Sequence, residues 1–279
     1  MIEHVLPAAV RCRAVRGHAL DRAPLHPEEA AAVARAVAKR KGEFAAGRAC
    51  ARAALGALGL PPLPVPRDGD RGAPVWPRGV VGSITHCEGY RAAAVARSPE
   101  ILTLGIDAEP HGPLPEGVLD VVHSTAAERE ALAALTEESP GLHWGRLLFS
   151  AKETVYKAWY PFHRRMLGFN EAELTFTRDP DADDRGAYTA RLLVPGPLLA
   201  EGVGPDVFSG RWLVRDGLLV TAIAVPGATG PLAGQAGAHL RGSRQAATEG
   251  RRAGAPADEQ AGEAEGPSVR PTPAAPASS

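Results

Sequence analysis

Three short apolar runs in the first half of the chain are the feature that most constrains its fold class. They read VVGSITH, YRAAAVAR and ILTLGIDAE and occupy residues 80–86, 90–97 and 101–109. Runs of this length that are bounded by turn residues predict β-strands. A chain with such strands is not an all-helical bundle, so its helices are expected to pack against a sheet.

A helix-forming segment precedes these strands. Residues 26–60 read HPEEAAAVARAVAKRKGEFAAGRACARAALGALGL. Pro27 suits a first helical position, and Gly42 predicts a break between two helices. Gly59 and the prolines that follow it end the second helix. This segment and the three strands form the first of two groups of helices and strands.

The second group follows directly. Thr125 and Glu128 fit a capping box for a helix that extends to about Leu135, and FSAKETVYKAWYP at 149–161 predicts another helix. The runs LTFT, AYTARLLV and FSGRWLVRDGLLVTAIAV predict strands, and the last is a hairpin that turns at Asp216 and Gly217. Two successive groups of interleaved helices and strands predict a mixed α+β fold.

Composition and charge exclude several classes of protein. The 279 residues are 44% hydrophobic and carry a formal net charge of −1. A core is therefore expected, and attraction to nucleic acid or to an anionic membrane is not. The three cysteines lack metal-type CxxC spacing and suit a reducing compartment. Neither an export signal nor an apolar run near the roughly 18 residues of a membrane span is found, so we expect a cytoplasmic protein.

The composition changes sharply near Pro226. From 229 to 279 the chain is mainly Ala, Gly, Pro, Ser, Arg and Glu and contains no aromatic residue. Such a segment buries too little apolar surface to offset the entropy lost when it becomes ordered. We therefore expect residues 229–279 to form a disordered tail.

The helix at 149–161 carries charges that packing does not require. Its apolar side chains fall on one arc, whereas Glu153 and Lys157 lie nearly opposite that arc, side by side. Such a pair is common on helix surfaces, where it contributes about 0.2–0.5 kcal/mol. Phe149 and Tyr160 point to the same side, however, which favours a cleft. The helix alone leaves both interpretations open.

A second acidic pair lies at the end of the strand at 101–109. Strand alternation points Asp107 and Glu109 of LGIDAEP to the same side. Converging carboxylates repel each other unless a cation lies between them, and hard oxygen ligands favour Mg²⁺. The alternative is that these acidic residues simply begin a turn.

The two motifs together resemble the paired signature of a known family. Gly105-Ile106-Asp107-x-Glu109, followed by Phe149-Ser150-x-Lys152-Glu153-x-x-x-Lys157, is similar to the 4′-phosphopantetheinyl transferase superfamily, in its larger surfactin-synthetase and enterobactin type. The segments EFAAGRACAR, GAPVWP and GSITHCEGYRAA also look like the coenzyme A-binding segments of that family. The resemblance covers about residues 30–225, and Thr154 stands where the family more often has Ala or Ser.

The resemblance implies an activity and an architecture. The activity is transfer of the 4′-phosphopantetheine arm of coenzyme A to a serine of an apo acyl, aryl or peptidyl carrier protein, with release of 3′,5′-ADP. Such carriers act in siderophore, nonribosomal peptide, polyketide or fatty-acid biosynthesis. The architecture is a monomer with two pseudo-symmetric α/β subdomains and the active site in the cleft between them. The subdomain at 1–106 would bind the nucleotide, and the subdomain at 107–228 would carry the metal site, the catalytic helix and the carrier docking site.

The resemblance also assigns the catalytic and metal-binding residues. Asp107, Glu109 and Glu153 would hold Mg²⁺, or Mn²⁺, against the pyrophosphate, and Asp107, Glu153 and Lys157 would form the catalytic set. Glu153 would take the serine proton directly or through a metal-bound water, and the sequence does not choose between these routes.

The predicted coenzyme A contacts form a longer set: Arg48, Arg52, Gly72, Ala73, Pro74, Ser83, Thr85, His86, Lys152 and Lys157. Arg48 and Arg52 share a helix face that suits the 3′-phosphate, and their alternative is a solvated helix flank. The alternative for Gly72–Pro74 is an ordinary turn, and the alternative for His86 is a structural role. Lys152 either reaches the phosphates from the side or only extends to solvent along the helix surface.

Met166, Leu167 and Phe169 are predicted to dock the carrier protein. They are large apolar residues next to Arg164 and Arg165, which suits an acidic partner with an apolar groove. The alternative is that they close the cleft as part of the core.

Two other functions would use similar residues. One is a Mg-dependent coenzyme A pyrophosphatase, and the other is a non-catalytic coenzyme A-binding protein. The sequence contains neither the Glu-rich helix motif of nucleoside-diphosphate hydrolases nor a GxxxxGK[ST] phosphate loop. A non-catalytic protein would not need all three carboxylates together with Lys157.

Overall fold

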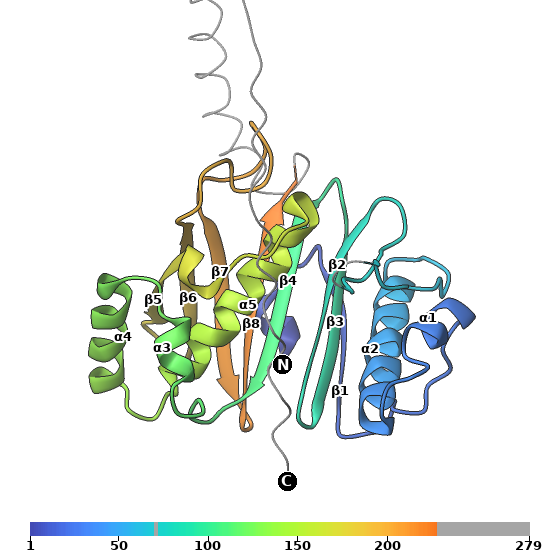
Figure 1. Cartoon of the computed structure of the whole chain (residues 1–279), viewed down its shortest axis with the longest axis horizontal. Helices are drawn as coiled ribbons and strands as arrows, with labels where there is room; N and C mark the ends of the chain where they lie inside the picture. Colours follow the sequence, from blue (N-terminus) through green and yellow to red (C-terminus); the bar gives the residue numbers. More distant parts are fainter. Residues whose placement is uncertain (70–71, 228–279) are drawn as a thin grey trace, which may run out of the picture. The chain divides into compact units, whose positions relative to one another are not determined.

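The structure is a computed structural model that describes residues 1–69 and 72–227. It contains helices and two antiparallel sheets, so the predicted α+β class is confirmed (Figure 1). The predicted tail at 229–279 lies outside the described residues. Within those residues, no helix is both long enough and apolar enough to cross a membrane.

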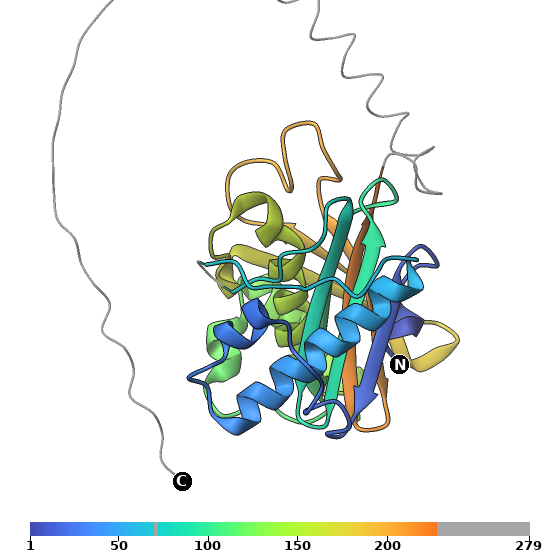
Figure 2. The same ribbon diagram turned by 90° about the vertical axis from the view of Figure 1, so that its right-hand side faces the viewer.

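The first sheet has three strands in the order β1-β3-β2. These strands are β1 (Arg11–Arg16), β2 (Val80–Cys87) and β3 (Tyr90–Arg97). The helices α1 (Pro27–Ala32) and α2 (Ala38–Ala57) precede β2, and α2 runs across one face of the sheet (Figure 2). Small side chains such as Ala51 and Ala54 of α2 pack there against Ala93 and Val95 of β3. The many alanines of both elements thus allow close packing of helix on sheet.

The predicted helix break at Gly42 is wrong. Gly42 lies inside α2, and the break comes earlier, between Ala32 and Ala38. A glycine within a helix costs only about 1 kcal/mol relative to alanine. Its missing side chain leaves room for Asp21, whose Cβ would lie 3.0 Å from a Cβ added to Gly42. Tertiary packing therefore explains this glycine.

The second sheet has five strands in the order β4-β8-β7-β6-β5. They are β4 (Ile101–Pro110), β5 (Ala172–Asp179), β6 (Ala182–Leu192), β7 (Phe208–Arg215) and β8 (Leu218–Pro226). β7 and β8 form the predicted hairpin, and its turn residues Asp216 and Gly217 have φ values of 51° and 74°. The predicted subdomain boundary after residue 106 falls within β4, and the division itself remains a prediction.

Three helices lie on one face of the second sheet: α3 (Val118–Val122), α4 (Ala126–Glu138) and α5 (Trp144–His163) (Figure 1). Thr125 is the predicted N-cap of α4, because Glu128 N donates to Thr125 Oγ1 at 3.1 Å, but the box is not reciprocal, since the Glu128 side chain accepts from Ser124 N. α5 lies directly against β4 at Gly105, where an added Cβ would be 2.3 Å from Thr154 O. The glycine therefore permits the close approach that brings α5 beside Asp107.

Side-chain hydroxyls join the two sheets where β2 and β4 lie side by side. Ile106 N donates to Ser83 Oγ, and Ala108 N donates to Thr85 Oγ1, both at 3.1 Å. Ser83 and Thr85 are buried. A shared hydrophobic core includes Tyr90, Ala92 and Ala94 of β3 and Ile106 and Ala108 of β4. These contacts fix Asp107, which lies between the two bonded residues of β4, relative to the first sheet.

The contact between β2 and β4, called the joint below, can be tested by removing one hydroxyl. Replacing Ser83 by Ala should lower the free energy of unfolding by about 1–3 kcal/mol, because the buried Ile106 N–H would lose its partner. Urea denaturation followed by tryptophan fluorescence measures this change. Ser209→Ala, at an exposed position on β7, is the matched control and should have an effect below about 0.5 kcal/mol. Equal effects of the two substitutions would contradict the role of the Ser83 hydroxyl.

Candidate active site

Asp107 is the centre of the candidate active site. Its buried carboxylate accepts hydrogen bonds from Thr85 Oγ1 at 3.0 Å, Lys157 Nζ at 2.6 Å and Ser150 Oγ at 2.8 Å. Thr85 belongs to β2, whereas Ser150 and Lys157 belong to α5. Asp107 of β4 therefore connects the first sheet with the predicted catalytic helix.

A chain of buried hydroxyls supports Asp107 from behind. Ser150 Oγ lies 2.9 Å from Thr221 Oγ1, which lies 2.6 Å from Thr154 Oγ1. All three residues are fully buried, and Thr221 of β8 stands opposite Asp107 in the strand register. Thr221 was not predicted from the sequence, because only its pairing with Asp107 across two strands that are distant in sequence marks it.

The charge of Asp107 acts on the other two predicted metal ligands, Glu109 and Glu153. Burial, and then repulsion by Asp107, raises the pKa of Glu109 to about 6, although Arg146 donates to its Oε2 at 3.2 Å. Burial also raises the pKa of Glu153, where Lys157 opposes the shift and Asp107 adds to it. The two sequence motifs thus form one electrostatically coupled group of carboxylates. Arg146 was not found from the sequence.

These carboxylates are candidate ligands for a metal ion. Within residues 1–69 and 72–227, no group of three or more His, Cys, Asp or Glu side chains is arranged to hold a metal ion as it stands. Lys157 and Arg146 instead hold Asp107 and Glu109 in ion pairs. The donor set nevertheless fits a hard divalent cation, because Asp107, Glu109 and Glu153 offer carboxylate oxygens and a cation would offset the repulsion of Asp107 on the other two.

Lys152 is buried on another side of α5. Its ammonium group donates to Val122 O at 2.7 Å, Glu128 Oε2 at 2.8 Å and Phe169 O at 2.9 Å. All three of its donors are therefore satisfied. This arrangement argues against the predicted phosphate contact of Lys152. The position follows from the turn of about 100° per residue that separates Lys152 from Glu153 on the helix.

Arg48 carries a buried guanidinium group. Its side chain lies over the Phe44 ring at 4.2 Å, and among the described residues its Nε has no hydrogen-bond partner. Burial lowers its pKa to about 10; the charges of Arg67, Arg40 and Arg52 add to this effect, and Glu29 opposes it. A concentration of positive charge around a buried donor suits an anion.

Arg52, the second arginine predicted to bind coenzyme A, is bonded to groups within the protein. Arg52 Nη1 lies 3.1 and 2.8 Å from the two carboxylate oxygens of Glu29, and Arg52 Nη2 donates to Pro24 O at 2.6 Å. Glu29 is fully buried and also accepts from Val65 N at 2.8 Å. Arg52 therefore anchors α1 to α2, which differs from the direct anion contact that the helix spacing predicted.

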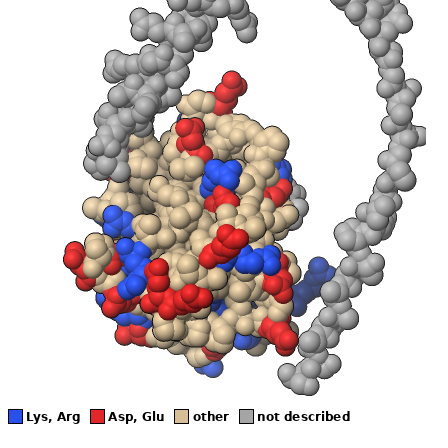
Figure 3. Space-filling model, turned by 90° about the vertical axis from the view of Figure 1, so that its left-hand side faces the viewer, with Lys and Arg blue, Asp and Glu red and all other residues tan. Residues whose placement is uncertain are grey.

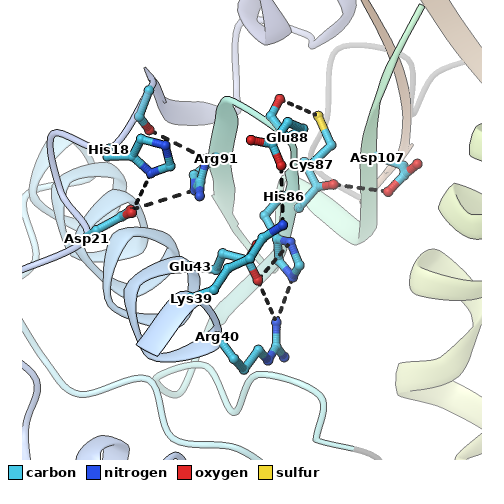
Figure 4. Close-up of polar contacts among 12 residues, drawn as sticks. His18, Asp21, Lys39, Arg40, Glu43, His86, Cys87, Glu88, Arg91 and Asp107 are labelled. Atoms are coloured by element: carbon cyan, nitrogen blue, oxygen red, sulfur yellow. Dashed lines mark hydrogen bonds and ion pairs between the residues drawn. The ribbon is translucent and has the colours of Figure 1, made fainter. Parts of the chain in front are cut away.

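His86 points from β2 toward α2, where it meets Arg40 and Glu43 (Figure 4). Arg40 Nη1 lies 2.8 Å from His86 Nε2, and Glu43 Oε2 lies 3.9 Å from His86 Nδ1. Burial and the charge of Arg40 lower the pKa of His86, which favours a neutral ring that accepts the Arg40 hydrogen bond. Arg40 is a further basic residue that the sequence analysis did not find.

The predicted Gly72, Ala73 and Pro74 line a cavity of about 440 Å³. Its other walls include Ser83 from β2 and Lys157 and Tyr160 from α5. The structure therefore brings this loop and Lys157 together. Ser83 Oγ accepts from Ile106 N, which leaves its hydroxyl proton for a ligand. Thr85 Oγ1 accepts from Ala108 N and donates to Asp107, so a coenzyme A contact by Thr85 would compete with the bond to Asp107.

The three predicted docking residues differ in exposure. Met166 is 49% exposed, whereas Leu167 is only 7% exposed and belongs to the core. Phe169 is half-buried and lies 5.5 Å from the Phe149 ring. On the face shown in Figure 3, acidic and basic side chains are mixed, so charge alone marks no docking surface there.

Comparison with known proteins identifies the family. Residues 28–96 match the model of the 4′-phosphopantetheinyl transferase N-terminal domain, and residues 103–190 match that of the 4′-phosphopantetheinyl transferase superfamily. The chain is 58% identical over 236 residues to 4′-phosphopantetheinyl transferase Svp of Streptomyces mobaraensis, an alignment that covers 82% of this chain and 91% of the relative.

Two further relatives are more distant. The chain is 49% identical to 4′-phosphopantetheinyl transferase PptT of Mycobacterium tuberculosis, over 71% of this chain and 85% of the relative. It is 37% identical to enterobactin synthase component D of Salmonella typhimurium, over 67% and 72%. The chain therefore belongs to the 4′-phosphopantetheinyl transferase superfamily and is a transferase, which confirms the family and the enzyme class predicted from its motifs.

The anchoring role of Lys152 predicts a loss of stability. Lys152→Met should lower the free energy of unfolding by about 3–5 kcal/mol, because Glu128 would keep a buried charge without its partner. Chemical denaturation measures the loss, and Lys39→Met, which removes an exposed lysine, is the control. Unchanged stability together with weaker coenzyme A binding would instead support the phosphate contact predicted from the sequence.

Proposed function

We propose that this transferase moves the 4′-phosphopantetheine arm of coenzyme A to a serine of an apo carrier protein and releases 3′,5′-ADP. The observation that carries this proposal is the grouping of Asp107, Glu109, Glu153 and Lys157 at one site. A second basic site lies at Arg48, whose Nε has no hydrogen-bond partner among the described residues. Coenzyme A carries a pyrophosphate and a separate 3′-phosphate, so it offers anionic groups to both regions. The carriers that we propose are those of siderophore, nonribosomal peptide, polyketide or fatty-acid biosynthesis.

The basic residues around Arg48 would bind the nucleotide. We assign the 3′-phosphate to Arg48, whose Nε is buried without a partner, and Arg40 and Arg67 would add positive charge. Arg52 and His86 would act nearby, Arg52 through its bond to Glu29 and His86 through its contact with Arg40. The loop at Gly72, Ala73 and Pro74 would line the adenine side of the cavity.

The three carboxylates would bind the pyrophosphate through a metal ion. Asp107, Glu109 and Glu153 would hold Mg²⁺ or Mn²⁺, which supplies positive charge against the pyrophosphate when it is bound. Lys157 would donate a hydrogen bond to a phosphate oxygen, since its ammonium group already lies in the site, 2.6 Å from Asp107. Preorganised charges of this kind stabilise a transition state without rearrangement during the reaction.

The transfer itself is a substitution at phosphorus. The serine oxygen of the carrier forms a bond to the phosphorus that bears the pantetheine arm, and the bond from that phosphorus to the bridging oxygen breaks. The electron pair leaves with 3′,5′-ADP. Glu153 takes up the serine proton, directly or through a water, and the burial that raises its pKa favours this role.

We propose that the carrier docks beside the end of α5. Met166 supports this placement because its apolar side chain is half-exposed just after the C-terminal end of α5, whereas Phe169 packs against Phe149 in the first half of α5. Leu167 belongs to the core and is therefore not assigned to docking. A Met166→Asp substitution that leaves the KM for carrier protein unchanged would contradict this placement.

The proposed function has a direct test. The purified chain is incubated with apo carrier protein, coenzyme A and Mg²⁺, and the mass of the intact carrier is measured. Transfer adds one phosphopantetheine group to the carrier. A coenzyme A pyrophosphatase would split coenzyme A without changing the carrier mass, and a non-catalytic binding protein would change neither. A panel of fatty-acid, polyketide and peptide carriers would then identify the partner class.

The assignment of Glu153 predicts a loss of activity without a loss of stability. Glu153→Gln should lower kcat at least about 100-fold, because it removes a charged ligand and base while keeping the side-chain volume. Its thermal midpoint should not fall, since a buried charge is removed. Turnover and calorimetry measure the two effects. Near-normal turnover at saturating Mg²⁺ would contradict the assignment.

The assignment of Arg48 predicts a selective loss of affinity. Arg48→Met should weaken binding of coenzyme A about tenfold, which corresponds to roughly 1.4 kcal/mol, and should leave dephospho-coenzyme A little changed. Titration calorimetry with both ligands measures the difference, and Arg35→Met, at an exposed position, serves as the control. Equal losses for both ligands would place the 3′-phosphate elsewhere.

A further inference from the structure

Asp68 is a carboxylate that connects a loop of the first group to the end of α5. Tyr160 Oη donates to Asp68 Oδ2 at 3.1 Å, and Arg164 Nη1 donates to the same oxygen at 2.9 Å. The Asp68 side chain is only 15% exposed although it lies in a loop. Two elements that are more than 90 residues apart in sequence thus meet at one carboxylate.

The same carboxylate organises its own loop. Ala73 N donates to Asp68 Oδ1 at 3.0 Å, and Asp68 N donates to Ala73 O at 2.8 Å. Gly72 has a φ of 73°, and a Cβ added there would lie 2.0 Å from Arg67 Nη2. The loop conformation therefore depends on this glycine and on the Asp68 bonds.

Asp68 also forms hydrogen bonds to residues in two walls of the cavity of about 440 Å³. One wall is the loop at Gly72, Ala73 and Pro74, and the other includes Tyr160 of α5 and Arg164, which directly follows that helix. Asp68 contacts residues of both walls, one through Oδ1 and the other through Oδ2. A change at Asp68 would therefore shift the loop relative to α5 without removing any group from Asp107 or Lys157.

We propose that Asp68 is a positioning residue that holds this loop against α5 and thereby sets the affinity of the enzyme for the nucleotide half of coenzyme A. The inference rests on the proposed function, because that function places coenzyme A in this cavity. Asp68 acts through Ala73, Tyr160 and Arg164. Its loss should therefore raise the KM for coenzyme A and have little effect on kcat.

The test compares Asp68→Ala with Asp68→Asn. Asp68→Ala should raise the Kd and the KM for coenzyme A about tenfold and change kcat less than about twofold. Binding of 4′-phosphopantetheine, which lacks the nucleotide, should be unchanged. Asp68→Asn should restore part of the affinity, since its amide oxygen still accepts from Ala73 N. Hydrogen exchange of the Ala73 amide should speed up in Asp68→Ala and less in Asp68→Asn.

Two further variants make the test specific. Tyr160→Phe removes only one of the bonds to Asp68 and should raise the Kd for coenzyme A by about threefold, which keeps the proposal testable if Asp68→Ala fails to fold. Asp183→Asn, which alters an exposed carboxylate paired with Arg178, is the matched control and should bind coenzyme A as the wild type does.

The opposing outcomes are distinct. Unchanged coenzyme A affinity in Asp68→Ala or Tyr160→Phe, or an equal loss for coenzyme A and 4′-phosphopantetheine, would overturn the role of Asp68. A lower thermal midpoint with unchanged affinity would also overturn it, because Asp68 would then only stabilise the fold. A wild-type enzyme that binds no coenzyme A would contradict the proposed function itself.

Discussion

The structure depends on the way in which two sheet edges are joined. β2 and β4 lie side by side, and the buried N–H groups of Ile106 and Ala108 need acceptors there. The hydroxyls of Ser83 and Thr85 provide them. Because Asp107 lies between these two N–H groups, the joint that closes the protein interior also fixes the carboxylate at the centre of the candidate active site.

Buried charged groups distinguish this interior from an ordinary apolar core. Burial, together with repulsion by Asp107, raises the pKa values of Glu109 and Glu153, and Arg48 is buried near other arginines. Buried charges without full compensation cost stability, so their persistence in one region favours a functional explanation. In the proposed function, Lys157 and a cation held by the carboxylates would meet the pyrophosphate, and the separate Arg48 guanidinium group would meet the second phosphate.

Local patterns allowed much of the fold and part of the site to be predicted. Most of the apolar arc of α5 is buried as the 3.6-residue period indicates, and the α4 N-cap at Thr125 and the β7–β8 turn lie where the sequence placed them. Asp107 and Glu109 were recognised because strand alternation and motif spacing are both local properties. The strand β1 (Arg11–Arg16) was not predicted, because its basic residues interrupt the apolar run that marked the other strands.

The remaining features depend on contacts between distant segments, which no local pattern encodes. The sequence alone predicts a helix break at Gly42, whereas in the structure Asp21 packs against this glycine inside the helix. Lys152 belongs to the same motif as Glu153 but is bound by Glu128 and two backbone carbonyls. Ser83 and Thr85 were recognised as important, whereas their bonds to β4 required the relative placement of the two sheets.

The most direct test of this account is a crystal structure of the enzyme with coenzyme A and Mg²⁺. The account predicts the 3′-phosphate against Arg48, the pyrophosphate between Lys157 and a metal ion held by Asp107, Glu109 and Glu153, and intact Ser83 and Thr85 bonds to β4. Coenzyme A bound away from the joint of β2 and β4, or a metal ion held by other residues, would contradict it.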